Sequence, residues 1–155
     1  MPDYDTMRVS DPERVKRAAQ DFIEAIPHAR ACNMHIEQVG GGSAAISMPY
    51  DLRLVGDPRT GVVHGGAVSA LMDTCCGAAV LSHPDGPSAS ATIDLRIDYM
   101  RAATPGQRII ARATCHHITR SVAFVRATAH DEEEDGPPVA TATGAFTADR
   151  SPAAS

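Results

Sequence analysis

The spacing of apolar residues between residues 10 and 26 predicts an amphipathic helix. Apolar side chains recur there every three or four positions, which places them in one stripe along a helix. Ser10 and Glu13 have the spacing of a capping box, and Pro12 suits the first helical turn. Pro27 is expected to end the helix, because proline cannot donate the backbone hydrogen bond that a continuing helix needs.

The next part of the chain, up to residue 61, is predicted to form a hairpin and a loop. Residues 30–39 and 44–50 are two candidate strands, and the glycines at 40–42 between them are typical of a tight turn. Residues 51–61, DLRLVGDPRTG, are mostly polar and contain an Asp-Pro pair, which favours a loop.

Residues 62–81, VVHGGAVSALMDTCCGAAVL, form a long segment of apolar and small residues. Its alternation is poor and alanine is frequent, which favours a helix over a strand from about residue 65 to 82. A membrane-spanning helix is not expected, because Asp73 would place a carboxylate in the middle of the lipid layer. We therefore predict a central helix that is buried in a globular domain, with a curved sheet covering most of it and a second subunit able to cover the rest.

From residue 92 onward the apolar pattern has a period of two, which is typical of β-strands. Four strands are predicted, at residues 92–100, 107–118, 121–131 and 138–148. In the first of these strands, alternation places Thr92 on the face opposite to Ile93 and Tyr99. The run DEEEDGPP at 131–138 is predicted to be a solvated turn without a function, since a run of like charges favours water.

The predicted order is therefore one helix, two strands, one long helix and four strands. This order favours an α+β fold in which a six-stranded, mostly antiparallel sheet wraps around the long central helix, with an additional N-terminal helix. At 155 residues the chain is expected to form a single domain over residues 10–148. Residues 1–9 are predicted to be a flexible tail and residues 149–155 a disordered tail.

The overall composition is that of a globular protein. The chain is 43% hydrophobic and 21% charged, and its formal net charge at pH 7 is −5. Nucleic acids and anionic membranes are not expected as partners, because both require a basic face. No apolar leader precedes the first predicted helix, which predicts a cytoplasmic protein.

The four cysteines are predicted to be free thiols, and no metal site is expected. The chain has no Cys-x-x-Cys pair of the kind that binds zinc. Cys115, His116 and His117 are adjacent candidate ligands. In a strand, Cys115 and His117 share one face and His116 takes the other, so the three side chains would not converge on one ion.

One pattern of residues has a specific chemical meaning. His64 is followed by two glycines, and Asp73 lies nine positions after His64 in the predicted helix. The next strand ends in DYMRAATPG, and a later segment has the sequence ITRSVAF. This combination resembles the hotdog-fold acyl-CoA thioesterases, and within them the PaaI-like (phenylacetate-pathway type) family. The resemblance covers about residues 30–147 and implies the hotdog fold, in which a sheet wraps around a central helix.

The start of the central helix fits a role in thioester hydrolysis. Amide groups there have no partner within the helix and form the positive end of its dipole. The Gly65 N–H is the candidate oxyanion donor, because a glycine lets a carbonyl approach closely. The resemblance implies that His64 lies beside the carbonyl or the departing sulfur. Asp73 is the candidate general base acting on water, or a nucleophile that forms a short-lived anhydride.

Gly65 and Asp73 cannot act on one thioester from a single copy of this helix. They are eight residues apart, which corresponds to about 12 Å of helical rise. A water that attacks a carbonyl must lie about 3 Å from both the base and the carbon. Two antiparallel copies of the helix can meet this condition, so we predict a symmetric homodimer with two composite sites, and also a dimer of dimers.

The resemblance also implies roles for residues outside the helix. Thr92 matches a hydroxyl residue of the family that holds the water beside the acid. The residues expected to contact coenzyme A are Gly66, Tyr99, Arg101, His117, Arg120 and Ser121. One position departs from the family pattern, because Pro58 stands where related enzymes often carry Asn, six positions before the motif histidine. Either Asp57 or a backbone group takes that role, or this branch works without it.

The function expected from these features is hydrolysis of an aryl- or medium-chain acyl-CoA to the free acid and coenzyme A. No separate cofactor is expected, since coenzyme A is part of the substrate. Two alternatives remain open. A hotdog enoyl-CoA hydratase or dehydratase would use His64 and Asp73 for proton transfer at carbon, and a non-catalytic acyl-CoA-binding protein would explain the missing Asn.

Overall fold

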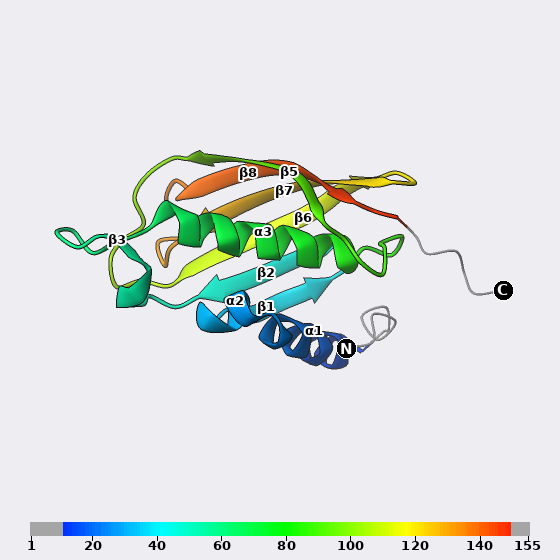
Figure 1. The fold of residues 1–155 in the computed structure, drawn as a ribbon, viewed down its shortest axis with the longest axis horizontal. Helices are drawn as coiled ribbons and strands as arrows, with labels where there is room; N and C mark the ends of the chain where they lie inside the picture. Colours follow the sequence, from blue (N-terminus) through cyan, green and yellow to red (C-terminus); the bar gives the residue numbers. More distant parts are fainter. Residues whose placement is uncertain (1–10, 150–155) are drawn as a thin grey trace.

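The computed structural model describes residues 11–149 and consists of a curved sheet with one long helix lying across it (Figure 1). The strands follow the order β1-β2-β6-β7-β8-β5, and every neighbouring pair is antiparallel. The helices are α1 (Pro12–Ala25), α2 (Pro27–Ala31) and α3 (Gly65–Leu81). The strands of the large sheet are β1 (His35–Gly40), β2 (Ser43–Met48), β5 (Thr92–Tyr99), β6 (Ile109–Ile118), β7 (Val122–His130) and β8 (Ala140–Thr147). The predicted α+β fold with its six-stranded sheet is confirmed.

A two-stranded ribbon, β3 (Val55–Asp57) and β4 (Val62–Val63), leads into α3. Strand β3 lies within residues 51–61, which were predicted to be a loop, and β4 directly follows that segment. The two tails predicted at residues 1–9 and 149–155 lie outside the described residues, apart from Asp149. Within residues 11–149, no helix is long and apolar enough to cross a membrane.

The N-terminal region differs from its prediction in two details. The side chain of Asp11 caps α1 by accepting a hydrogen bond from Glu13 N at 3.1 Å, whereas Ser10 lies outside the described residues. Pro27 does end the first helix, but it also begins the short helix α2, because proline is well accepted at a first helical position. Strand β1 therefore begins at His35, five residues later than predicted.

Helix α3 buries one side against the sheet and leaves the other side uncovered within the protomer. Its buried side chains include Val68, Leu71, Met72, Cys75, Cys76, Ala79 and Val80. The residues at 66, 70, 73, 74 and 77 recur at helical spacing and keep part of their surface exposed. The sheet therefore covers one side of the helix as predicted, and the cover expected from a second subunit stays a prediction.

Strand β5 forms an open edge of the sheet and contains a bulge at its start. It pairs only with β8, and the register shifts between Thr92 and Asp94. The extra residue turns Thr92 toward α3, on the same side as Tyr99, and leaves Ile93 56% exposed. The prediction that Thr92 and Tyr99 point to opposite faces is wrong, because simple alternation cannot anticipate a bulge.

A second bulge changes the faces of the residues near the end of β6. Cys115 pairs with Val125 and is buried, whereas His117 pairs with Phe124 on the outer face and stacks against its ring with centroids 6.0 Å apart. His116 is also exposed. Cys115 and His117 therefore do not share a face, contrary to the prediction. Within residues 11–149, no group of three or more His, Cys, Asp or Glu side chains is arranged to hold a metal ion.

Candidate active site

The first turn of α3 is organised by His64, the N-cap residue. Its ring Nδ1 accepts a hydrogen bond from Gly66 N at 2.8 Å. A neutral histidine that accepts at Nδ1 carries its proton on Nε2, so His64 presents an N–H donor to the solvent side. Gly56 of β3 passes directly behind it: a Cβ on Gly56 would lie 2.9 Å from His64 Cα. The ribbon β3–β4 thus holds His64 from behind.

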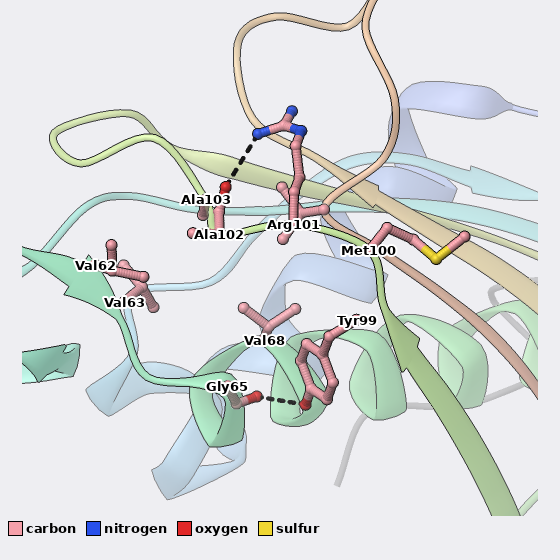
Figure 2. A pocket seen from close by; sticks show the side chains of 10 residues that line it. Val62, Val63, Gly65, Val68, Tyr99, Met100, Arg101, Ala102 and Ala103 are labelled. Carbon is pink, nitrogen blue, oxygen red and sulfur yellow. Dashed lines mark hydrogen bonds between the residues drawn. The ribbon is translucent and has the colours of Figure 1, made fainter.

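The peptide group between Gly65 and Gly66 is held from both sides. Tyr99 at the end of β5 donates its hydroxyl hydrogen to Gly65 O at 2.7 Å (Figure 2). On the other side of this peptide group, His64 accepts a hydrogen bond from Gly66 N. Gly65 is the first residue of α3, and its own N–H has no hydrogen-bond partner within residues 11–149. A fixed and unpaired amide at a helix start is suited to stabilise an oxyanion.

Asp73 and Thr92 form the second part of the site. The Thr92 hydroxyl donates to Asp73 Oδ1 at 2.7 Å. Asp73 is only half-buried in the protomer, so the prediction that it is buried is not fulfilled by one chain alone. Within the described residues Asp73 Oδ2 accepts no hydrogen bond, and the Thr92 oxygen keeps lone pairs that can accept one from water. The pair can therefore orient a water molecule and accept its proton.

The oxyanion candidate and the acid candidate lie at opposite ends of β5. Tyr99 touches Gly65 and Thr92 touches Asp73, and a strand of this length spans about 23 Å. One protomer therefore does not bring Gly65 and Asp73 together. This agrees with the separation expected from the helical rise.

Arg101 is engaged in a buried ion pair. Its guanidinium binds both carboxylate oxygens of Asp131, at 2.6 and 2.9 Å, and also donates to the carbonyl oxygens of Ala102 and Pro137. Thr104 donates to the same carboxylate from its N–H and its hydroxyl. At most one guanidinium N–H of Arg101 therefore remains to bind a ligand. The expected contact between Arg101 and coenzyme A stays a prediction.

Asp131 is fully buried, although it begins the acidic run that was predicted to be a solvated turn. That prediction is wrong for this residue, while Glu132 and Glu133 are exposed as expected. The Arg101 guanidinium and the Thr104 donors hold the pKa of Asp131 well below its usual range. The sequence offered one weak signal, namely that Asp131 is the last residue of a predicted strand.

Replacing Asp131 by asparagine is expected to lower the free energy of unfolding at pH 7 by about 3 kcal/mol, because it leaves Arg101 without its counter-charge. The pKa of Asp131 is lower in the folded chain than in the unfolded chain, so its contribution is complete above about pH 4 and is lost as the pH falls further. Urea unfolding at pH 7 and pH 3 should show the difference between wild type and variant shrinking in acid. The exposed neighbour substitution Glu132→Gln is the control, and an equal loss there would contradict this role.

The hairpin that contains His117, Arg120 and Ser121 lies at the end of the sheet remote from the start of α3 (Figure 1). Ser121 O accepts from Ala148 N, and Ala91 O accepts from Thr147 N, so this hairpin lies beside the start of β5. It is therefore on the side of the Asp73–Thr92 pair rather than of Gly65. Its expected contact with coenzyme A stays a prediction.

Pro58 lies in the turn between β3 and β4, next to Asp57. The Asp57 carboxylate accepts hydrogen bonds from Arg59 N and Nε at 3.0 and 3.2 Å, which lowers its pKa. This carboxylate is thus engaged within the turn. An asparagine side chain could also donate a hydrogen bond, which the Asp57 carboxylate cannot do.

Two cavities flank the first turn of α3. The cavity on the Gly65 side has a volume of about 270 Å³ and a mostly aliphatic lining (Figure 2). The cavity on the Gly66 side has a volume of about 320 Å³ and is lined in part by His28, Arg53 and His64. A thioester whose carbonyl meets Gly65 N–H therefore has a mostly aliphatic lining on one side and a lining with ionisable side chains on the other.

The cysteines do not provide a nucleophile. Burial raises the pKa of Cys75 to about 12 and also raises the pKa of Cys76, and both thiols are fully buried. A thiol in such surroundings is not ionised near neutral pH and is inert. The reactive groups of the site are therefore a carboxylate, a hydroxyl and backbone amides, a set that suits the hydrolysis of an activated ester.

The fold and this arrangement define a hotdog-fold enzyme whose central helix has a glycine-rich start and carries an acid further along. The model of the thioesterase superfamily matches residues 60–137, which include α3, β5, β6 and β7. The chain belongs to the thioesterase superfamily and is a thioester hydrolase.

A relative named for its activity and two solved structures agree with this membership. The medium/long-chain acyl-CoA thioesterase YigI of Escherichia coli K12 is 27% identical over 144 residues, covering 84% of this chain and 92% of YigI. A crystal structure of a Pseudomonas aeruginosa protein is 34% identical with a TM-score of 0.75, covering 85% of this chain and 97% of that one. The N33D mutant of phenylacetic acid degradation protein PaaI from Thermus thermophilus is 28% identical with a TM-score of 0.67, covering 78% and 97% of the two chains. The expected resemblance to PaaI-like thioesterases is confirmed.

Proposed function

We propose that this protein hydrolyses the thioester of medium-chain or aryl acyl-CoA, with Asp73 acting on the carbonyl carbon through water or directly. The observation that carries this proposal is the hydrogen bond from Thr92 to Asp73, in a helix whose first amide is unpaired. The relative YigI, a medium/long-chain acyl-CoA thioesterase, supports acyl-CoA as the substrate and the medium-chain part of this proposal.

Each residue of the site has its own role in the proposed reaction. Gly65 N–H stabilises the oxyanion, and the Tyr99 hydroxyl keeps the following peptide group in place. Asp73 takes a proton from a water held by Thr92, or attacks the carbonyl itself to give an anhydride that water then opens. His64 donates from Nε2 to the carbonyl or to the departing sulfur.

The tautomer of His64 argues against a hydratase. A hydratase would need the imidazole as a base, but Nδ1 already accepts from Gly66 N and Nε2 then carries the proton. In the neutral form that caps the helix, His64 is a donor. The thioesterase is therefore the better fit of the two reactions.

The site is complete only when a second copy is present. Gly65 and Asp73 of one chain are separated by about 12 Å along the helix, so the acid works with Gly65 of the partner. Two surfaces support this pairing: the uncovered small-residue face of α3, and the open edge of β5 with unpaired backbone groups. The proposed assembly is a symmetric homodimer, with a dimer of dimers as a further prediction that sedimentation equilibrium can check.

A panel of acyl-CoA esters tests the proposed activity. Butyryl-, hexanoyl-, decanoyl-, palmitoyl-, benzoyl- and phenylacetyl-CoA are incubated with the protein, and free thiol is followed with a chromogenic disulfide. We expect thiol release to be fastest with medium-chain or aryl esters. Tight binding of these esters without thiol release would instead show a non-catalytic acyl-CoA-binding protein, and hydration of crotonyl-CoA would show a hydratase.

A further inference from the structure

The cavity on the Gly65 side of α3 lies between the first turns of that helix and the segment after β5 (Figure 2). It has a volume of about 270 Å³. Its aliphatic lining comes from β4, α3, the segment after β5 and the residue before β8, namely Val62, Val63, Val68, Met100, Ala102, Ala103 and Val139. Gly65 itself lines the cavity, so the cavity opens at the proposed oxyanion amide.

The polar side chains in the lining have little to offer a polar ligand. The Tyr99 hydroxyl donates to Gly65 O. The Arg101 guanidinium is bound to Asp131 and to two carbonyl oxygens. A polar group that entered this space would lose its water without gaining comparable partners, whereas a hydrocarbon loses nothing.

The cavity on the other side of the helix start is also partly apolar, but its lining includes ionisable side chains. It is lined by His28, Arg53 and His64 in addition to apolar groups, and Arg53 is largely exposed. The two halves of an acyl-CoA differ in the same way, since the acyl chain is apolar and the pantetheine and phosphate portion is polar. The ionisable side chains on this side favour the pantetheine and phosphate portion, which leaves the Gly65 side for the acyl chain.

We propose that the cavity on the Gly65 side binds the acyl chain and that Ala103 sets how much of the chain it accepts. This inference rests on the proposed function and adds the position and the length limit of the acyl group. A methylene occupies about the volume of a water molecule, ~30 Å³, so the cavity accommodates on the order of eight to ten carbons. A medium-length chain fills it.

Ala103 is suited to limit the chain length because it is small, buried and held in place. It is 4% exposed and lies between Arg101 and Thr104, both of which bind the buried carboxylate of Asp131. This anchor prevents the wall from moving away when a larger side chain is introduced. A larger residue at 103 therefore takes its volume from the cavity.

The test is a comparison of Ala103→Val and Ala103→Leu with the wild type on butyryl- and decanoyl-CoA. Each methylene kept out of the cavity lowers kcat/KM about fourfold. We expect the decanoyl-to-butyryl ratio of kcat/KM to fall by about 15-fold in Ala103→Val and about 60-fold in Ala103→Leu, with butyryl-CoA turned over almost normally. Ala89→Leu, an exposed position in the loop after α3 and outside the cavity, is the matched control and should leave the ratio unchanged.

Binding of S-decyl-CoA and S-butyl-CoA, two thioethers that cannot be hydrolysed, provides a readout that does not depend on activity. The preference for S-decyl-CoA in calorimetry should decline in the same order of variants. If the wild type releases no thiol from any ester but the thioether preference still declines, the proposed function fails and the cavity assignment stands. If the wild type is active and the Ala103 variants lower both esters equally or leave the ratio unchanged, the cavity assignment is wrong.

Discussion

Replacing Asp73 by asparagine is expected to lower kcat for the preferred acyl-CoA by about 10³-fold, with little change in KM. Asparagine keeps the size of the side chain and an oxygen that accepts from Thr92, but it can neither take a proton from water nor attack the carbonyl. Steady-state thiol release, together with circular dichroism to verify folding, measures the effect. A variant that keeps more than a tenth of the wild-type kcat would rule out Asp73 as the reacting group.

Thr92 supplies a graded comparison for the same site. Thr92→Ser keeps the hydroxyl that binds Asp73 Oδ1, whereas Thr92→Val removes it with almost no change in shape. The serine variant should therefore be much more active than the valine variant.

A single turnover in ¹⁸O-labelled water distinguishes the general-base route from the anhydride route, because only the anhydride route transfers label to the Asp73 carboxylate.

Replacing Gly65 by proline is expected to lower kcat by about 10²- to 10³-fold, because it removes the amide hydrogen that stabilises the oxyanion. The backbone accepts this change. Gly65 is the first residue of α3, a favoured position for proline, and His64 at φ −61° and ψ 136° already has the conformation required before proline. The Michaelis parameters for decanoyl-CoA and the melting temperature are the measurements.

Gly65→Ala is the matched control, since it adds the same Cβ but retains the N–H. That Cβ would lie 3.4 Å from the nearest atoms of the Tyr99 ring, a contact that a small shift relieves. We expect this variant to keep most of the wild-type activity. If alanine and proline lower kcat equally, crowding against Tyr99 and not the lost amide is responsible.

Mixing the two inactive proteins tests the composite site. After unfolding and refolding together, Asp73→Asn and Gly65→Pro chains should form heterodimers in which one site has neither substitution. About half of the dimers are heterodimers with one intact site of two, so about a quarter of the wild-type activity returns. No recovery, with heterodimers confirmed by native mass spectrometry, would show that each chain completes its own site or that the dimer differs from the one proposed.

The elements with a regular pattern could be predicted from the sequence. The helix predicted from about residue 65 to 82 agrees with α3 to within one residue at each end, and the four later strands lie within the ranges that alternation indicated. Local signals suffice there, because helix and strand each impose one repeat on the side chains that face the core. The structure of the N-terminal region was harder to predict, since Pro27 is compatible both with the end of one helix and with the start of the next.

The candidate acid and the glycine-rich helix start could also be predicted, but their surroundings could not. A bulge at the start of β5 turns Thr92 toward Asp73, and strict alternation had placed it on the other face. Asp131 belongs to an acidic run, and only the folded chain shows that it is buried against Arg101. Bulges and buried ion pairs depend on which segments become neighbours, and a local repeat does not contain that information.

The sequence by itself determined the classes of structure in this protein: a central helix, a sheet of six strands, an acid eight residues after a helix-start glycine, and a separation too large for one chain to bridge. The tertiary structure decided which groups meet. It joined Thr92 to Asp73, Tyr99 to Gly65 and Arg101 to Asp131, and it left one face of α3 and the edge of β5 uncovered. The periodic pattern of buried residues can be recognised in the sequence, whereas contacts between distant segments arise only when the sheet curves around the helix.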